Sequence, residues 1–361
     1  MKRLFMFLAV AGLATSCSLF SGDEPERYGW VEETPLYGDV ASVKIINYEL
    51  KDNFGAVVKD GVNWSKEYKF NEAGDVIERL EFGYSGYLRD KYTFGYDENG
   101  NLLDESSFDS EGQLDTKFAY KNDENGNPIE RTICYADGTI GGRETYKYDE
   151  AGNLIEKAEY DAYGQLNGKY AYKYDEKNNL VEETEYDYNG SLSSKNTYNY
   201  DKKGNKIEAI CYGYDGSTRS KETYAYDKKG NLIEESCQNS YGTLDYKKAY
   251  TYDADGNMIE AVEYNNNGQL EDKVTYSYDA DGNMIELVTY LRNGLVNNKF
   301  TYAYNEDGKV VEATQLDNQG RMNSQVTYKY DDKGNMIDFA AYSGEGRSAM
   351  NEVVFEITYR K

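Results

Sequence analysis

The sequence predicts an all-β protein built from tandem 26-residue β-hairpins, and three observations carry this prediction. Glycines recur every 26 residues, apolar and polar residues alternate between them, and the chain holds 39 tyrosines but three prolines and no long helical pattern. A fixed period of this size indicates a repeat architecture. Alternation with a period of two indicates β-strands.

Two glycine series set the register of eleven consecutive repeats and divide each repeat into steps of 12 and 14 residues. Asn178 occupies one position of the first series, and asparagine also tolerates a left-handed backbone. The first series comprises Gly74, Gly100, Gly126, Gly152, Gly204, Gly230, Gly256, Gly282, Gly308 and Gly334. The second comprises Gly86, Gly112, Gly138, Gly164, Gly190, Gly216, Gly242, Gly268, Gly294, Gly320 and Gly346.

Residues 146–171 represent one repeat, with hairpin loops expected at 149–153 and 161–165. Aspartate favours the start of a type I turn, and glycine favours the left-handed position that follows. Counting outward from both loops sets Tyr146 opposite Glu156 and Arg143 opposite Glu159. One face should then carry Tyr146, Tyr148, Leu154, Glu156, Tyr160, Leu166 and Tyr170, and the other Thr145, Ile155, Glu159 and Lys169.

An aromatic face repeated over eleven hairpins cannot lie open in water, so the long antiparallel meander should curve into a spiral or tube. An extended single-layer sheet and a β-solenoid are the alternatives. The expected organisation is a signal peptide at 1–16, an acidic flexible tether at 17–36, N-terminal capping strands at 37–65, eleven repeats at 66–348 and a C-terminal capping strand at 349–361.

The first residues predict export. Lys2 and Arg3 precede an apolar run, and small residues lead into Cys17. This order is typical of a secretory signal and is similar to a bacterial lipoprotein signal that is cleaved before the cysteine. We therefore expect lipid on Cys17 to hold the protein on a membrane. An ordinary secretory peptide with an incidental cysteine is the alternative.

The amino-acid composition argues against several classes of partner and of catalytic site. The net charge of −25 argues against nucleic acid and against adsorption to anionic lipid. The chain contains no histidine, so no histidine-based catalytic triad is available. Cys211 and Cys237 hold the same place in adjacent repeats and should lie about 9.6 Å apart, beyond disulfide reach. We expect these two and Cys134 to be free thiols.

The motif YDxxGN begins at Tyr96, Tyr148, Tyr200, Tyr226, Tyr252, Tyr278 and Tyr330. It resembles the tyrosine-aspartate (YD) repeat of the Rhs family, over about residues 66–348. That resemblance implies a spiralling β-sheet. The C-terminal strand leaves no room for an effector domain, which argues against toxin delivery. Together with the signal, the repeats look like small Bacteroidetes-type repeat lipoproteins of the outer membrane, on its periplasmic or surface face, anchored by palmitate.

A carboxylate column is the most tempting chemical feature. Neighbours in it should lie about 9.6 Å apart, near the separation of an inverting glycosidase pair. Because a catalytic pair occurs once and this carboxylate recurs at every repeat, we interpret it as a structural ladder bonded to facing tyrosine hydroxyls. The ladder comprises Glu130, Glu156, Glu182, Glu208, Glu234, Glu260 and Glu286, together with Glu78, Asp104, Glu312 and Asp338.

No cofactor or resident metal is expected. The turns at Asp97, Asp123, Asp253 and Asp279 resemble calcium loops, but each offers too few oxygen ligands for calcium. The leading hypothesis is therefore a non-enzymatic cell-envelope lipoprotein, a binding or spacer scaffold for glycan or protein. A glycan-active enzyme using acids inside the tube, and the shell of a secreted partner, are the alternatives.

Overall fold

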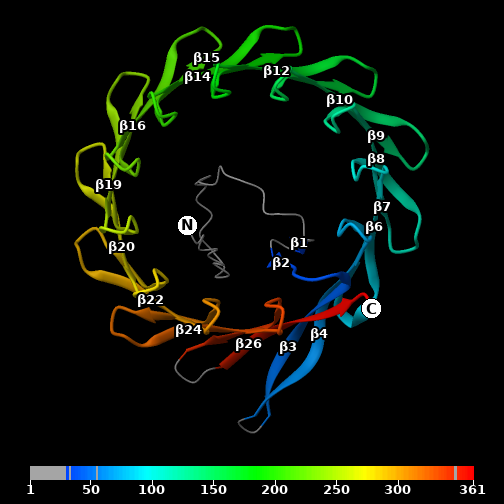
Figure 1. The fold of residues 1–361 in the computed structure, drawn as a ribbon, viewed down its shortest axis with the longest axis vertical. Coiled ribbons are helices and arrows are strands. Elements are labelled where there is room, and N and C mark those ends of the chain that lie inside the picture. Colours follow the sequence, from blue (N-terminus) through cyan, green and yellow to red (C-terminus); the bar gives the residue numbers. More distant parts are fainter. Residues whose placement is uncertain (1–29, 32–33, 54–55, 345–347) are drawn as a thin grey trace.

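The protein is a closed ring of antiparallel strands. The computed structural model describes residues 30–31, 34–53, 56–344 and 348–361. Strands β3 to β26 form one meander of neighbours in sequence, and β26 pairs with β3 to close it (Figure 1). The prediction of an all-β hairpin meander curved into a tube is confirmed, and the extended sheet is wrong.

The element bounds follow the glycine register. A short two-stranded sheet is formed by β1 Trp30–Val31 and β2 Thr34–Pro35, and one 3-10 turn spans Tyr84–Gly86. The ring consists of β3 Val40–Asn53, β4 Ala56–Phe70, β5 Val76–Phe82, β6 Leu88–Tyr96, β7 Leu102–Phe108, β8 Leu114–Asn122, β9 Pro128–Tyr135, β10 Ile140–Tyr148, β11 Leu154–Asp161, β12 Leu166–Tyr174, β13 Leu180–Asp187, β14 Leu192–Tyr200, β15 Lys206–Gly213, β16 Thr218–Tyr226, β17 Leu232–Asn239, β18 Leu244–Tyr252, β19 Met258–Asn265, β20 Leu270–Tyr278, β21 Met284–Tyr290, β22 Val296–Tyr304, β23 Val310–Asp317, β24 Met322–Tyr330, β25 Met336–Ser343 and β26 Ser348–Tyr359.

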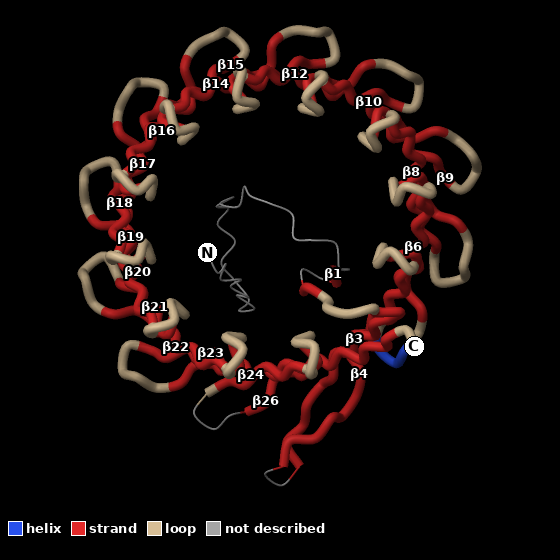
Figure 2. Tube along the Cα trace, viewed as in Figure 1, coloured by secondary structure: helices blue, strands red, loops and turns tan. Residues whose placement is uncertain are grey.

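Within the described residues, the loops of both glycine series are three-residue hairpins of the expected kind. In the loop at 149–153, the Gly152 N–H donates to the Asp149 carbonyl at 3.1 Å, and Gly152 has φ of 85°. Asn178 adopts φ of 64° at the equivalent place, as predicted from its position in the glycine series. The two loop sets lie on opposite rims: the first-series turns point toward the ring centre, and the second-series loops flare outward (Figure 2).

The predicted strand register is wrong by one residue, because each hairpin from β4 to β25 contains a register shift typical of a β-bulge beside its loop. Tyr148 pairs with Leu154 as expected, but Lys147 then pairs with Glu156 and Tyr146 with Lys157. Ile155 is the extra residue, and its side chain is 36% exposed. Tyr146 and Glu156 consequently lie on opposite faces. Bulges also increase local twist, which suits a sheet that closes on itself.

An apolar seam closes the ring between β25 and β4. Its buried cluster includes Val43 and Phe355, and Leu36, which is 2% exposed, belongs to it. Figure 1 places β2, immediately before Leu36, inside the ring. The cluster therefore lies on the inner face. Its members are Leu36, Val40, Val43, Ile45, Tyr68, Phe70, Met336, Val353 and Phe355.

The inner face of the other strands follows from strand pairing, because Cα partners on adjacent strands point to the same side of the sheet. Val43 pairs with Tyr68, which occupies the Tyr146 position of the first repeat. The aromatic column therefore lines the inner face throughout, and Glu156 and Lys169 lie on the outer face, since alternate residues of a strand point to opposite sides. The predicted capping strands β3, β4 and β26 are members of the ring itself.

Several sequence predictions lie outside the described residues. These are the signal peptide at 1–16, the lipidated Cys17 and most of the tether at 17–36. Within the described ranges, no helix is long and apolar enough to span a membrane. Cys134, Cys211 and Cys237 are free thiols.

Candidate functional site

The carboxylate column forms an ion-pair ladder on the outer face. The Glu156 carboxylate forms ion pairs with two lysines. The Nζ of Lys147, on one neighbouring strand, lies 2.7 Å from it, and the Nζ of Lys169, on the other, lies 2.5 Å from it. Both lysines lower the pKa of the Glu156 carboxyl. The same two-sided arrangement recurs as Glu78 with Lys69 and Lys91, Glu130 with Lys121 and Arg143, and Glu182 with Lys173 and Lys195. Ion pairs with one lysine of a neighbouring strand are formed by Glu208 with Lys221, Glu234 with Lys247, Glu260 with Lys273 and Glu286 with Lys299.

The predicted partners of this ladder are wrong: lysines, not tyrosine hydroxyls, hold the carboxylates. The error follows from the bulges, because the tyrosine column that was expected beside Glu156 lies on the opposite face. A general acid requires a carboxyl with a raised pKa. Since the Glu156 pKa is lowered, the ladder geometry suits strand-to-strand attachment and not proton donation.

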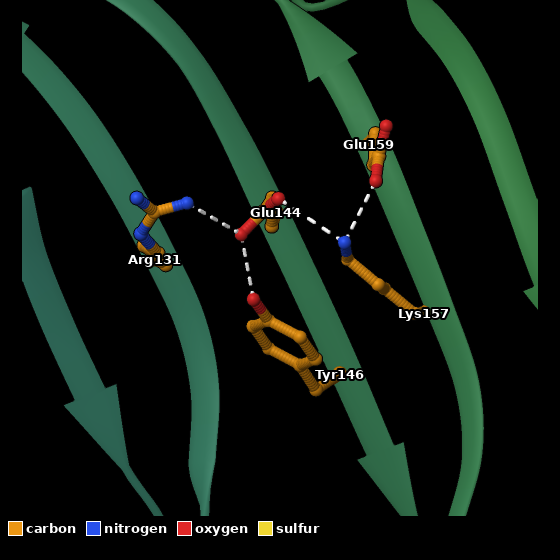
Figure 3. A network of polar contacts seen from close by, with 5 residues as sticks. All are labelled: Arg131, Glu144, Tyr146, Lys157 and Glu159. Atoms are coloured by element: carbon orange, nitrogen blue, oxygen red, sulfur yellow. Dashed lines mark hydrogen bonds and ion pairs between the residues drawn. The ribbon is translucent and has the colours of Figure 1, made fainter. Parts of the chain in front are cut away.

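A polar network occupies the inner face. Glu144 accepts bonds from Arg131 at 3.0 Å and from the Tyr146 hydroxyl at 2.6 Å, and it pairs with Lys157 at 3.2 Å (Figure 3). Lys157 also contacts Glu159 at 2.7 Å. Burial favours the neutral acid, but these donors hold the pKa of the Glu144 carboxyl below its ordinary value. The residues of this network come from three consecutive strands of the ring, β9, β10 and β11.

Similar tyrosine–glutamate contacts continue along this arc of the inner face. Tyr198 donates to Glu183 at 3.2 Å, and Tyr246 donates to Glu235 at 3.0 Å. Burial first, and the facing carboxylate second, raise the pKa of both hydroxyls. From β20 onward the equivalent inner positions turn apolar. They include Val274, Leu287, Phe300, Val326, Phe339 and Val353.

The tyrosine that begins the YDxxGN motif joins adjacent repeats, and Tyr174 and Tyr304 do the same at equivalent positions where the rest of the motif is incomplete. The Tyr200 hydroxyl donates to the Leu180 carbonyl at 2.7 Å, and Asn122 makes the equivalent bond to the Leu102 carbonyl at 3.0 Å. Each bond reaches twenty residues back, to the first residue of an earlier strand. The other donors are Tyr96, Tyr148, Tyr174, Tyr226, Tyr252, Tyr278, Tyr304 and Tyr330. Asn122 therefore preserves the contact although it departs from the motif.

The calcium-like turns use their oxygens internally. One carboxylate oxygen of Asp253 accepts the N–H groups of Asp255 at 3.0 Å and Asn257 at 2.8 Å, and the other accepts the Asn257 side chain at 3.0 Å. Over the described ranges, no group of three acids or cysteines is arranged to hold a metal ion. Turn chemistry accounts for these aspartates.

Glu352 differs from the repeated acids. Burial, then a hydrogen bond with Asp338, raise the pKa of its carboxyl, while Lys59 lies 3.2 Å from it. It sits on β26, next to the inward-pointing Val353, and so faces outward at the seam. Among the Asp and Glu carboxyls in the described part of the chain, Glu352 is the one whose pKa is raised, and it lies outside the ring and not in the lumen where the enzyme hypothesis places its acids.

Sequence reasoning missed two groups of residues. Arg131 and Lys157 hold the same place in adjacent repeats, but that column also contains Glu183 and Ala209, and the column of Glu144 also contains Tyr170, so neither column showed one residue type that would mark a site. Exposed tyrosines in the second-series loops, such as Tyr163 and Tyr241 at 88% and 91% exposure, were also missed. They could have been found from the sequence, because each is an aromatic residue within a predicted loop and not at an aromatic position of a strand.

Comparison with known proteins gives likenesses of fold. No family model and no curated protein matches the chain. The structure of TcdB2-TccC3 without its hypervariable C-terminal region is similar over 80% of this chain, at 14% identity and a TM-score of 0.36, and the chain spans 19% of its length. A Photorhabdus luminescens Tc holotoxin pore is similar over 80% of this chain, at 14% identity and a TM-score of 0.30, and the chain spans 19% of its length. A porin-like protein from Bacteroides uniformis is similar over 88% of this chain and 98% of its own, at 13% identity and a TM-score of 0.25.

Proposed function

We propose that the protein is a non-enzymatic, lipid-anchored scaffold of the cell envelope, similar to small repeat lipoproteins with YD motifs. The observation that carries this proposal is the ion-pair ladder. Its most regular acids each hold a lysine of a neighbouring strand, as Glu182 holds Lys173 and Lys195 at 2.6 and 2.7 Å. The repeated chemistry of the chain therefore supports the ring itself and leaves its loops and inner face to meet partners.

Anchoring rests on Cys17. The described chain leaves the ring beside a first-series turn, since Asn335 of the turn at 331–335 donates to the Tyr37 carbonyl at 2.9 Å. A lipid upstream of Tyr37 would hold this rim toward the membrane and present the flared rim away from it. Changing Cys17 to serine should move the protein from the membrane fraction to the soluble fraction, and mass spectrometry of the wild-type N-terminus should find acyl chains on Cys17.

Binding without chemistry is tested with the lipid-free protein. We expect it to be retained on isolated envelope glycan or envelope protein, without release of reducing sugar ends. Hydrolysis of a polysaccharide that disappears in Glu352→Gln, but persists in the matched Glu156→Gln variant, would overturn the proposal in favour of a glycan-active enzyme.

A second candidate, the shell of a secreted partner, is favoured by the uneven inner face. Its charged arc around Glu144 and its apolar arc around Phe300 would suit a cargo with two such surfaces. Co-expression with the product of a neighbouring gene tests this candidate. A complex that survives gel filtration, and that is lost when Phe300 is changed to glutamate, would support it.

A further inference from the structure

Four consecutive second-series loops each expose one tyrosine at the flared rim. Tyr163, Tyr188, Tyr214 and Tyr241 are 88%, 67%, 69% and 91% exposed. The loops join β11–β12, β13–β14, β15–β16 and β17–β18, and Figure 1 shows these connections pointing outward along one arc of the ring. We call these four residues the tyrosine row.

The backbone beneath the row is fixed before any partner arrives. The Asp161 carboxylate accepts the N–H groups of Tyr163 and Gln165, both at 2.9 Å. Asn239 holds the N–H groups of Tyr241 and Thr243 in the same way, at 3.0 and 3.2 Å. A partner therefore meets preorganised loops, which lowers the entropic penalty of binding.

Spacing sets the size of the partner. Neighbouring loops are separated by two strands, or about 9.6 Å at the level of the sheet. The flare increases this separation at the tips. One small ligand cannot touch two tyrosines, so the row suits an extended chain that crosses several loops.

Charge sets the chemistry of that chain. The four loops with two flanking residues on each side, residues 159–167, 185–193, 211–219 and 237–245, contain six acids and one base. The acids are Glu159, Glu185, Asp161, Asp187, Asp215 and Asp245, and the base is Arg219. Arg219 already places its guanidinium 5.9 Å from the centre of the Tyr214 ring. Acid-flanked tyrosine rings attract cations, and guanidinium groups stack on them best.

We propose that the tyrosine row binds an extended, arginine-rich segment of a partner protein, with guanidinium groups seated on the tyrosine rings. This inference rests on the proposed scaffold function and names the class of partner. The row lies on the rim opposite the one that holds Tyr37, so the lipid anchor proposed upstream of Tyr37 would leave the row facing away from the membrane.

The test uses the lipid-free full chain and a 15-residue peptide of alternating arginine and serine, about 50 Å long when extended. We expect saturable binding that weakens as salt rises, and that is weaker for the lysine version of the peptide. Changing Tyr163 and Tyr241 together to leucine should weaken binding at least about tenfold, because leucine keeps apolar area but removes the ring. Changing both to phenylalanine should preserve it.

The chain offers a matched control. Asn267 occupies the place of Tyr163 in the loop at 265–269, whose Asn265 carbonyl oxygen holds the Asn267 N–H at 3.0 Å. Asn267→Leu should leave the affinity unchanged. Equal affinity of the leucine and phenylalanine double variants, or binding of a neutral polysaccharide in place of the peptide, would overturn the proposal. If the two double variants bind equally well, but the wild-type protein is still retained on isolated envelope material, the arginine proposal fails and the scaffold function stands. If the wild-type protein is not retained on envelope material either, the scaffold function fails as well.

Discussion

Removing the hydroxyl bonds between repeats tests how the ring is held together. Tyr200 donates to the Leu180 carbonyl at 2.7 Å, and burial raises the pKa of its hydroxyl, so it stays a donor. Tyr200→Phe deletes this bond and leaves the ring in place. A neutral hydrogen bond of this kind contributes about 1 kcal/mol to the free energy of unfolding.

The effect should add across alternate repeats. Tyr148, Tyr200, Tyr252 and Tyr304 donate to carbonyls at 3.0, 2.7, 2.8 and 2.6 Å. Successive members are four strands apart, about 19 Å, and share no partner, so their effects should sum to about 4 kcal/mol. Urea unfolding followed by circular dichroism measures the total, and hydrogen exchange of the β13 amides measures the single change.

Tyr163→Phe is the control, because its ring is 88% exposed at a loop tip. It should leave the free energy of unfolding unchanged. A fourfold phenylalanine variant within about 0.5 kcal/mol of the wild type, the scatter expected for surface changes, would refute the idea that these hydroxyls join the repeats.

Three further predictions follow from the fold. Leu36→Ala should lower the free energy of unfolding by about 2–5 kcal/mol, measured in urea, because Leu36 is 2% exposed in the seam cluster; an unchanged midpoint would contradict the packing. Gly230→Ala forces a side chain to φ of 95° and should destabilise by about 1–2 kcal/mol, whereas Gly230→Asn should destabilise less, as Asn178 indicates; equal losses in thermal unfolding would argue against backbone strain. Acid should destabilise the ring. The pKa values of Asp149 and Glu156 are lowered from 3.8 and 4.5, so the stabilisation by these carboxylates is complete above those ordinary values and is lost as pH falls below them and through the lowered pKa values of the folded ring; a melting temperature that stays constant down to about pH 3 would contradict this.

The glycines made the hairpins predictable. A left-handed residue is needed at a fixed place in each loop, and glycine or asparagine is the residue that meets this need. Gly152 and Asn178 do so with φ of 85° and 64°. The loops, the strand order and the inward aromatic column follow from that register.

The faces were not predictable in the same way. Nothing in the residues around Ile155 marks it as the extra member of a bulge, yet this one residue turns Glu156 to the face opposite Tyr146. A one-residue slip reverses every side chain of a strand. The lysine partners of the carboxylates therefore became visible in the structure alone.

Closure of the ring could not be predicted from the repeats either. Similar repeats specify the curvature of the sheet, but not the number of strands after which its two edges pair. Closure depends on the apolar residues that β26 and β3 bring together, among them Phe355 and Ile45, which are Cα partners. These residues lie outside the repeats. Their alternation predicted strands, but not that the two strands pair with each other.

Closure can be measured directly with an engineered disulfide. Lys44 on β3 and Glu356 on β26 are Cα partners, and paired Cα atoms in antiparallel sheets lie about 4.5–5.5 Å apart, within disulfide reach. In a background with the four native cysteines changed to serine, the variant Lys44→Cys with Glu356→Cys should form an intramolecular disulfide, identified by mass spectrometry of the linked peptides. The matched pair Lys44→Cys with Glu208→Cys, which joins β3 to β15 across the ring, should remain reduced (Figure 1). Failure of the first pair to oxidise within one molecule would contradict the closed ring.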